Sequence, residues 1–151
     1  MTRLARRTLV AAGAIALAGP GLAARQLMEV WKNRGCTCCT AWAESFRAAG
    51  FLVTMHELDD LTAARAAAGV PSDLAGCHTA RIAGYTVEGH VPLEDVERLL
   101  ATRPPLLGLA VPGMPMGSPG MEMPGMAGEA FQVIGFASNG KRHVFRDIPA
   151  G

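Results

Sequence analysis

The chain has 151 residues, half of them apolar, and a formal net charge of +1. This length suits one domain with its own core, and the near-neutral charge argues against nucleic acid as a partner. Its four cysteines are few enough that their spacing decides which sulfur chemistry is open to it.

Residues 1–23 are predicted to be an export signal peptide. Arg3, Arg6 and Arg7 form a basic start, and the apolar run at 9–18 is too short to span a bilayer in the ordinary way. An uncleaved anchor is the alternative. The Arg6-Arg7 pair suggests the twin-arginine route, which carries folded cargo. We therefore expect a periplasmic protein without membrane contact after cleavage, in a compartment where cysteines are paired or ligated.

Hydrophobic patterns predict seven elements in the order strand, helix, strand, helix, strand, strand, helix. A mixed sheet with helices on both faces fits this order, which is also the order of the thioredoxin fold. The predicted fold class for 24–103 is therefore α/β, with a thioredoxin-like mixed sheet flanked by helices. In chain order the elements span 27–32, 38–49, 51–58, 61–68, 79–82, 85–88 and a helix that starts at Pro92 and stops before Pro104.

The rest of the chain, 104–151, is predicted to pack on the same domain. Leu109 to Met126 is so rich in proline and glycine that we expect no regular element there. Two β-favouring runs at 131–137 and 141–147 flank Ser138-Asn139-Gly140, and Asn-Gly is a strong hairpin signal. This hairpin is expected to extend the sheet or pack beside it.

Cys36, Cys38 and Cys39 lie at the predicted turn between the first strand and the first helix. The N-terminus of a helix stabilises thiolate, which is the form that binds metal ions and attacks disulfides. Cys36 and Cys39 have the C-x-x-C spacing of a redox pair, whereas the third thiol makes shared metal ions reasonable. The alternative is a simple disulfide with a buried free thiol.

A second loop carries Cys77 and His78. In the thioredoxin fold the loop before the third strand packs against the cysteine motif, so we expect Cys77 opposite the other three cysteines. His78 is a candidate ligand, although its ring is equally suited to a structural role. The histidines at 56, 90 and 143 are not assigned as ligands, because lone histidines are mostly surface or structural residues.

The methionine segment, residues 114–126, offers thioether sulfur in a stretch that cannot form a helix face. Thioether and thiolate together select Cu(I) over zinc or hard ions. We expect the segment to fold back as a lid that supplies one or two ligands, with Met114, Met116 and Met121 as candidates. Met123 and Met126 are interpreted as part of a flexible linker.

Four stretches together carry a family resemblance: Gly35-Cys36-Thr37-Cys38-Cys39 with Trp42, then 76–80, 84–92 and 108–121. On these motifs the chain resembles the CopG-like family of bacterial copper-resistance proteins over nearly all of its mature length. The resemblance implies an exported thioredoxin-like domain that binds copper through its Cys-x-Cys-Cys motif, with a C-terminal extension near the metal. It also implies a part in copper detoxification through a change in copper's redox state. Met123 and Met126 depart from the family pattern and leave the ligand count open.

Three functions follow from these residues. The first hypothesis is a periplasmic copper-binding protein for copper resistance and homeostasis, in which the four cysteines hold one or more ions and interconvert Cu(I) and Cu(II). Its partners would be copper ions and periplasmic copper efflux or transfer proteins. The second hypothesis is a thioredoxin-type thiol–disulfide oxidoreductase that uses Cys36 and Cys39. The third is a structural zinc or iron–sulfur site, which leaves the methionine segment without a role.

Overall fold

The computed structural model describes residues 26–151, so the predicted signal peptide at 1–23 lies outside the described residues. No helix in the described part is long and apolar enough to cross a membrane. The elements are β1 (Leu27–Asn33), α1 (Thr37–Ala48), β2 (Leu52–Leu58), α2 (Thr62–Ala67), η1 (Ser72–Leu74), β3 (His78–Ile82), β4 (Tyr85–Glu88), α3 (Leu93–Thr102), β5 (Gly108–Ala110), β6 (Phe131–Phe136) and β7 (Arg142–Ile148).

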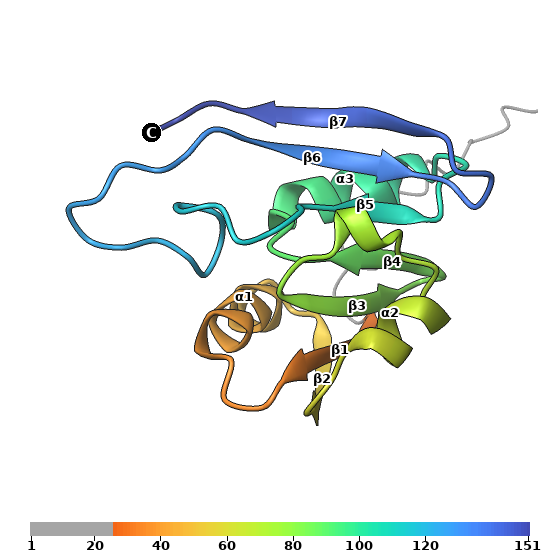
Figure 1. Cartoon of the computed structure of the whole chain (residues 1–151), viewed down its shortest axis with the longest axis horizontal. Coiled ribbons are helices and arrows are strands. Elements are labelled where there is room, and N and C mark those ends of the chain that lie inside the picture. The colour runs from red at the N-terminus through yellow and green to blue at the C-terminus, as the bar shows by residue number, and fades with distance from the viewer. Residues whose placement is uncertain (1–25) are drawn as a thin grey trace, which may run out of the picture.

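All seven strands belong to one sheet, in the order β2-β1-β3-β4-β5-β6-β7 (Figure 1). β1 is parallel to β2, whereas β3 runs antiparallel to both β1 and β4. A crossover helix, α1, joins the parallel pair, and α3 follows the β3–β4 hairpin. The predicted α/β class, a thioredoxin-like mixed sheet flanked by helices, is therefore confirmed.

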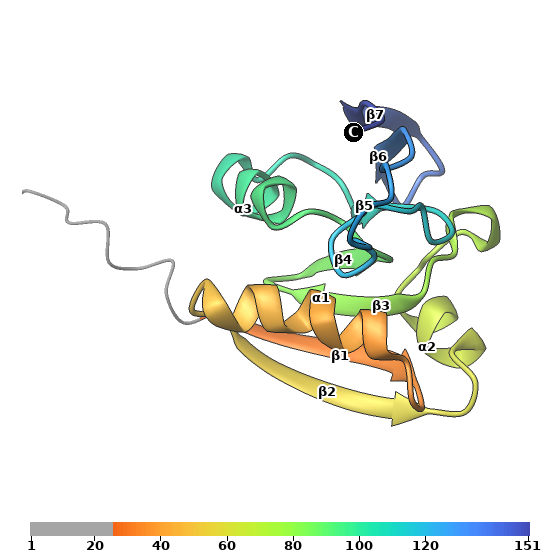
Figure 2. The ribbon, with the colours of Figure 1, turned by 90° about the vertical axis from the view of Figure 1, so that its left-hand side faces the viewer.

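The helices cover the two faces of the sheet unequally. On one face the buried side chains of α1 and α3 pack on those of the strands in one apolar core. On the other face α2 makes polar contacts: Arg65 Nε donates to Glu88, and the Thr86 hydroxyl donates to the Ala68 carbonyl. Successive strand residues face opposite ways, so Val87 joins the core while its neighbours Thr86 and Glu88 meet α2. In Figure 2, α2 lies apart from α1 and α3.

The C-terminal part joins the same sheet through a short strand that the sequence did not reveal. β5 pairs in parallel with β4 and antiparallel with β6. The expectation of no regular element from Leu109 onward is thus wrong for Leu109 and Ala110. These residues are apolar and precede the first proline of the segment, Pro112, so they suit a buried central strand. The β6–β7 hairpin is confirmed, and it extends the sheet.

Candidate metal centre

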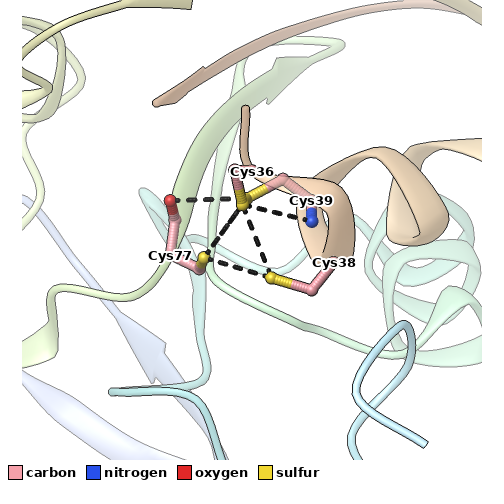
Figure 3. A group of neighbouring side chains, drawn as sticks. All are labelled: Cys36, Cys38, Cys39 and Cys77. Atoms are coloured by element: carbon pink, nitrogen blue, oxygen red, sulfur yellow. Dashed lines mark hydrogen bonds between the residues drawn. A yellow bond between two sulfur atoms is a disulfide. The ribbon is translucent and has the colours of Figure 1, made fainter. Parts of the chain in front are cut away.

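Four sulfur atoms converge where α1 begins (Figure 3). Cys36, Cys38 and Cys39 come from the start of α1, and Cys77 comes from the loop before β3. Cys77 Sγ lies 3.3 Å from Cys36 Sγ and 3.6 Å from Cys38 Sγ. It lies 3.2 Å from Cys39 Sγ. The structure thus brings together the two loops whose approach the fold predicted, and we call these four residues the cysteine cluster.

The redox state of the cysteine cluster is mixed. Cys36 and Cys39 form a disulfide, whereas Cys38 and Cys77 are free thiols. A disulfide carries no thiolate, which is the form of cysteine that binds metal ions. All four sulfurs can act as ligands only after this bond is reduced, a step that takes two electrons and two protons.

Local backbone geometry explains why the motif presents its sulfurs at the helix end. Gly35 has φ +74° and turns the chain after β1. Cys36 is then extended and is the N-cap of α1, where its Sγ accepts a hydrogen bond from the Cys39 backbone N–H at 3.3 Å. The helix therefore starts at Thr37, one residue before the predicted start. The positive end of the helix dipole therefore faces the sulfurs of the motif.

A buried carboxylate holds the loop that carries Cys77. Glu88 is fully buried, and its Oε1 accepts from the Gly76 backbone N–H at 2.8 Å and from Arg65 Nε at 2.9 Å. Its Oε2 accepts from the Thr79 hydroxyl at 2.6 Å. These bonds fix the residues on both sides of Cys77. Sequence reasoning did not single out Glu88, although a glutamate at the end of an apolar strand is a signal that could have identified it.

The protein environment keeps Cys77 protonated when no metal is bound. Burial raises the pKa of the Cys77 thiol to about 12, and the neighbouring Cys38 thiol adds to this effect. A soft metal ion that binds Cys77 as thiolate must therefore displace its proton.

Two histidines lie against the cysteine cluster. His78 is fully buried, its ring centroid is 4.2 Å from that of Trp42, and burial holds its pKa well below the usual range. Its ring centroid is also 5.0 Å from that of His90, which is buried as well. One ring nitrogen from each histidine and the Cys77 Sγ lie within 4.8 Å of one another.

The interpretation of His90 as a lone histidine is therefore wrong. The β3–β4 hairpin places the two histidines side by side, because Thr79 pairs with Glu88 and the Gly89 backbone N–H donates to the His78 carbonyl. The register of the predicted hairpin was the signal that could have revealed this pairing. The other two histidines lie elsewhere: the ring of His56 stacks on that of Trp31, and His143 belongs to β7.

The methionine segment folds back onto α1. The Pro119 carbonyl oxygen lies 2.8 Å from His90 Nδ1. At Gly120 the two backbones approach so closely that a Cβ would lie 2.7 Å from the Cys38 carbonyl oxygen and 2.9 Å from the Trp42 nitrogen. Gly120 has φ +85°, a backbone conformation that residues other than glycine rarely adopt.

The candidate methionines differ in exposure. Met114 is 56% exposed, whereas Met116 and Met121 are half-buried. Met123 and Met126 are 52% and 56% exposed. Exposure thus distinguishes Met114 from Met116 and Met121, and all three stay predictions as ligands.

Two solved structures share this fold over most of the chain. The first, "Copper resistance protein copG- Form 1", is 42% identical, with a TM-score of 0.76, and the match covers 82% of this chain and 97% of that one. "Copper resistance protein copG- Form 2" is 41% identical, with a TM-score of 0.78, and the match covers 83% and 99%. The family described as "Protein of unknown function, DUF411" matches residues 74–121, which include Cys77, both buried histidines and Met121. No protein with a curated description matches.

Proposed function

Because this chain belongs to the family of CopG copper resistance proteins, we propose that it binds copper through its cysteine cluster as part of copper resistance or homeostasis. One observation carries the proposal: Cys77, distant in sequence, lies within 3.6 Å of all three sulfurs of the Cys-x-Cys-Cys motif. Several thiolates so close together suit a soft ion, and they can share more than one. In this proposal Cys36, Cys38, Cys39 and Cys77 are the thiolate ligands.

The proposal includes interconversion of Cu(I) and Cu(II). Oxidation of the Cys36 and Cys39 thiolates to the disulfide releases two electrons, which reduce two Cu(II) ions to Cu(I). An external dithiol restores the thiols by exchange and is itself oxidised to a disulfide. The disulfide between Cys36 and Cys39, beside two free thiols, supports this step because it is the expected oxidised product.

The lid and the neighbouring histidine complete the proposed ligand set. Met116 and Met121 are half-buried in the methionine segment, which contacts α1 through Gly120. Met114 is the exposed candidate of the three. Thioether donors bind Cu(I) and cannot be lost to disulfides. His78 offers a neutral imidazole beside Cys77.

The site of action is proposed to be the periplasm. A basic start followed by a short apolar run supports export, and copper resistance is a function that the related proteins carry in their names. The partners proposed with it are copper ions and periplasmic copper efflux or transfer proteins.

Metal analysis of the reduced protein under anaerobic conditions tests the copper proposal. Given Cu(I) and excess Zn²⁺, the wild type is expected to retain at least one copper per chain and Cys77→Ser clearly less. Met121→Leu should weaken binding relative to Met126→Leu, a matched change at an exposed position. Retention of zinc in place of copper, or equal copper in Cys77→Ser and wild type, would contradict the proposal.

Thiol counting tests the redox step. Reduced protein mixed anaerobically with Cu(II) should lose two thiols for each two Cu(I) ions captured by a Cu(I)-specific chelator. The Cys36→Ser variant should not form the disulfide and should give little Cu(I). Cu(I) production that is unchanged in this variant would exclude the Cys36–Cys39 pair as the electron source.

The disulfide at the start of α1 also favours a second candidate, a thioredoxin-type thiol–disulfide oxidoreductase. The metal-free protein would then catalyse reduction of insulin by dithiothreitol, and Cys36→Ser would abolish the rate. A rate no higher than that of dithiothreitol alone would remove this candidate.

A further inference from the structure

The two edge strands of the sheet differ in how they discourage pairing with another strand. A register shift between Val133 and Ile134 interrupts the ladder of β6 and β7. Four side chains of β7 can also be charged, namely Arg142, His143, Arg146 and Asp147. Charges and irregularities of this kind hinder strand pairing. By contrast, β2 pairs with β1 in an unbroken register over all of Leu52–Leu58, and it contains no lysine, arginine or proline. The open edge of the sheet is therefore at β2.

Alternate backbone groups of β2 point away from the rest of the sheet. The Leu52 N–H and the Leu58 carbonyl form hydrogen bonds with residues that flank β1, each of 3.0 Å. Since backbone groups alternate in direction along a strand, Val53, Met55 and Glu57 direct their N–H and C=O groups to the open edge. Among residues 26–151 no strand lies beyond this edge (Figure 2). The edge is therefore ready to accept one more strand.

The sequence of β2, Leu-Val-Thr-Met-His-Glu-Leu, is suited to pairing with itself. When two copies run antiparallel about a two-fold axis at Met55, this residue meets the partner's Met55, and Val53 meets the partner's Glu57. Each pair then exchanges both of its N–H and C=O hydrogen bonds, as hydrogen-bonded pairs of antiparallel strands do. All three outward residues are paired about this axis. Any other register sets outward groups against inward ones or leaves outward groups unpaired.

The side chains that meet about this axis are complementary. On the face away from the core, Leu52 meets the partner's Leu58, and Thr54 meets the partner's His56, so apolar lies against apolar and polar against polar. Leu52 is 55% exposed in the single chain, although it is a large apolar side chain. On the core face, Met55 already packs at the margin of the apolar core, which the partner's Met55 would extend.

Opposite charges also meet about the axis. Arg47 Nη2 donates to the Val53 carbonyl at 2.9 Å, and Val53 meets the partner's Glu57. The guanidinium at this end of β2 therefore lies beside a carboxylate of the other copy, and the two-fold axis repeats the contact. Within its own chain Arg47 pairs with Glu44, and Glu57 pairs with Lys32. The side chain of Glu57 is 43% exposed, so it remains accessible to a second cation.

We propose that β2 is the interface of a homodimer, in which two copies pair their β2 strands antiparallel about Met55 and join their sheets into one. The occupant of the edge is a second copy of this chain, because the residues that meet under the two-fold axis match in hydrogen bonding, polarity and charge. One pair of short strands buries little area compared with the roughly 1,200–2,000 Å² of stable interfaces. The dimer is therefore reversible and depends on concentration. It needs no metal ion and is independent of the proposed function.

Sedimentation equilibrium of the metal-free protein in its disulfide form, kept anaerobic, measures the dimer. The mass of the wild type should rise from one chain toward two as the concentration increases. Met55→Pro removes the N–H that faces the partner's Met55 but no bond to β1, because that N–H points outward. Its dissociation constant should be at least about tenfold higher, since two hydrogen bonds are lost across the axis. Val144→Pro, on the opposite edge strand β7, is the matched control and should leave the constant unchanged.

Disulfide trapping tests the position of the axis. In a Cys38→Ser, Cys77→Ser background, the sulfur introduced by Met55→Cys meets its own counterpart in the other copy. The Cα atoms of such a pair lie about 5.5 Å apart, a separation that suits a disulfide. Val144→Cys places a thiol on the other edge strand, where the side chain is 45% exposed. Under mild oxidation the linked dimer should form at least about tenfold faster with Met55→Cys, because pairing raises the local thiol concentration.

The outcomes decide the dimer without reference to copper. A wild type that stays monomeric at every concentration would overturn it, and so would an equal dissociation constant in Met55→Pro. Equal linking rates for Met55→Cys and Val144→Cys would overturn pairing about Met55, even if the proline variant failed to fold. Circular dichroism and urea midpoints of each variant show whether the fold is retained. Met55→Pro should retain as much copper as wild type, so failure of the copper proposal would leave the dimer standing.

Discussion

Cys77 shows how a single residue can derive its chemistry from its surroundings. In sequence it is an isolated cysteine in a loop, and in the structure it contacts three other sulfurs. Glu88 and Arg65 fix the loop, while burial and the neighbouring thiol keep Cys77 protonated. In the proposed copper centre the same residue is an unreactive thiol without metal and a thiolate ligand with it, since a metal ion replaces the proton.

The reactivity of Cys77 provides a first prediction. Its pKa of about 12 leaves very little thiolate at pH 8, and thiolate is the form that reacts with iodoacetamide. In the metal-free disulfide form the Cys77 peptide should be alkylated at least ~100-fold more slowly than in the denaturant-unfolded chain. Mass spectrometry of the labelled peptides measures both rates. Similar rates in the two states would show that burial does not protect this thiol.

At the scale of elements, β5 connects the thioredoxin-like part to the C-terminal hairpin. It is only three residues long, Gly108–Ala110, yet all three are buried and it pairs on both sides. At Gly108 the strands are so close that a Cβ would lie 2.7 Å from the Thr86 carbonyl carbon. Glycine is required there by this close approach and not by a turn.

Gly108→Ala is therefore expected to destabilise the protein by at least about 2 kcal/mol, because β5 must move away from β4. Gly151→Ala makes the same change where a Cβ meets nothing within 4 Å, so it should alter stability by less than ~0.5 kcal/mol. Urea unfolding of both variants measures the difference. Equal urea midpoints for the two variants would mean that the close approach of β5 to β4 does not exclude a side chain at position 108.

A second contact between distant elements predicts a pH dependence. Arg142 on β7 donates two hydrogen bonds to Asp73 in η1, and these lower the pKa of the Asp73 carboxyl. A carboxyl whose pKa is lower in the folded than in the unfolded state adds stability above the unfolded value. That stability is lost as the pH falls through the folded value.

Asp73→Asn should therefore lower the melting temperature slightly at pH 7, since the pair is exposed to solvent. The difference from wild type should start to shrink below about pH 5 and should vanish below the folded pKa. Arg142→Gln should give the same profile, because it removes the other partner. Thermal unfolding across this pH range measures it, and a difference that persists in acid would rule out this ion pair as the cause.

At the scale of the whole molecule, the proposed centre joins three separate parts of the chain. The start of α1, the loop before β3 and the methionine segment all meet there. The unfolded chain keeps only the thiols of the Cys-x-Cys-Cys motif close together. A metal ion bound between all three parts therefore binds the folded state more tightly, and it must stabilise the fold.

Cu(I) added to the reduced protein should therefore raise its free energy of unfolding. At a free copper concentration of 100 times Kd, the gain should be at most about 2.7 kcal/mol, because Cu(I) also binds the motif of the unfolded chain. Cys77→Ser should lose most of this gain, whereas Thr37→Ser, an exposed change within the motif, should keep it. Thermal unfolding with buffered Cu(I) under anaerobic conditions measures both. No shift in the wild type would argue against a copper site that links these elements.

The sequence by itself determined the features that are local in the chain. Periodicity and turn residues predicted the order of β1 to β4 with their helices, and Asn139-Gly140 predicted the C-terminal hairpin. The Cys-x-Cys-Cys spacing predicted sulfur chemistry at a helix start, because neighbouring residues in one motif cannot lie far apart. The convergence of Cys77 followed only once the strand order suggested a known fold.

Only the tertiary structure decided the features that depend on pairing between distant residues. The short strand β5 is stabilised by neighbours on both sides, so its own sequence carries little signal. The hairpin register places His90 beside His78, and the returning methionine segment places the Pro119 carbonyl 2.8 Å from its Nδ1. The sequence named the cysteines and His78 as candidate ligands. Only packing showed that His90 lies beside His78 and Cys77, since burial and orientation are properties of neighbours in space.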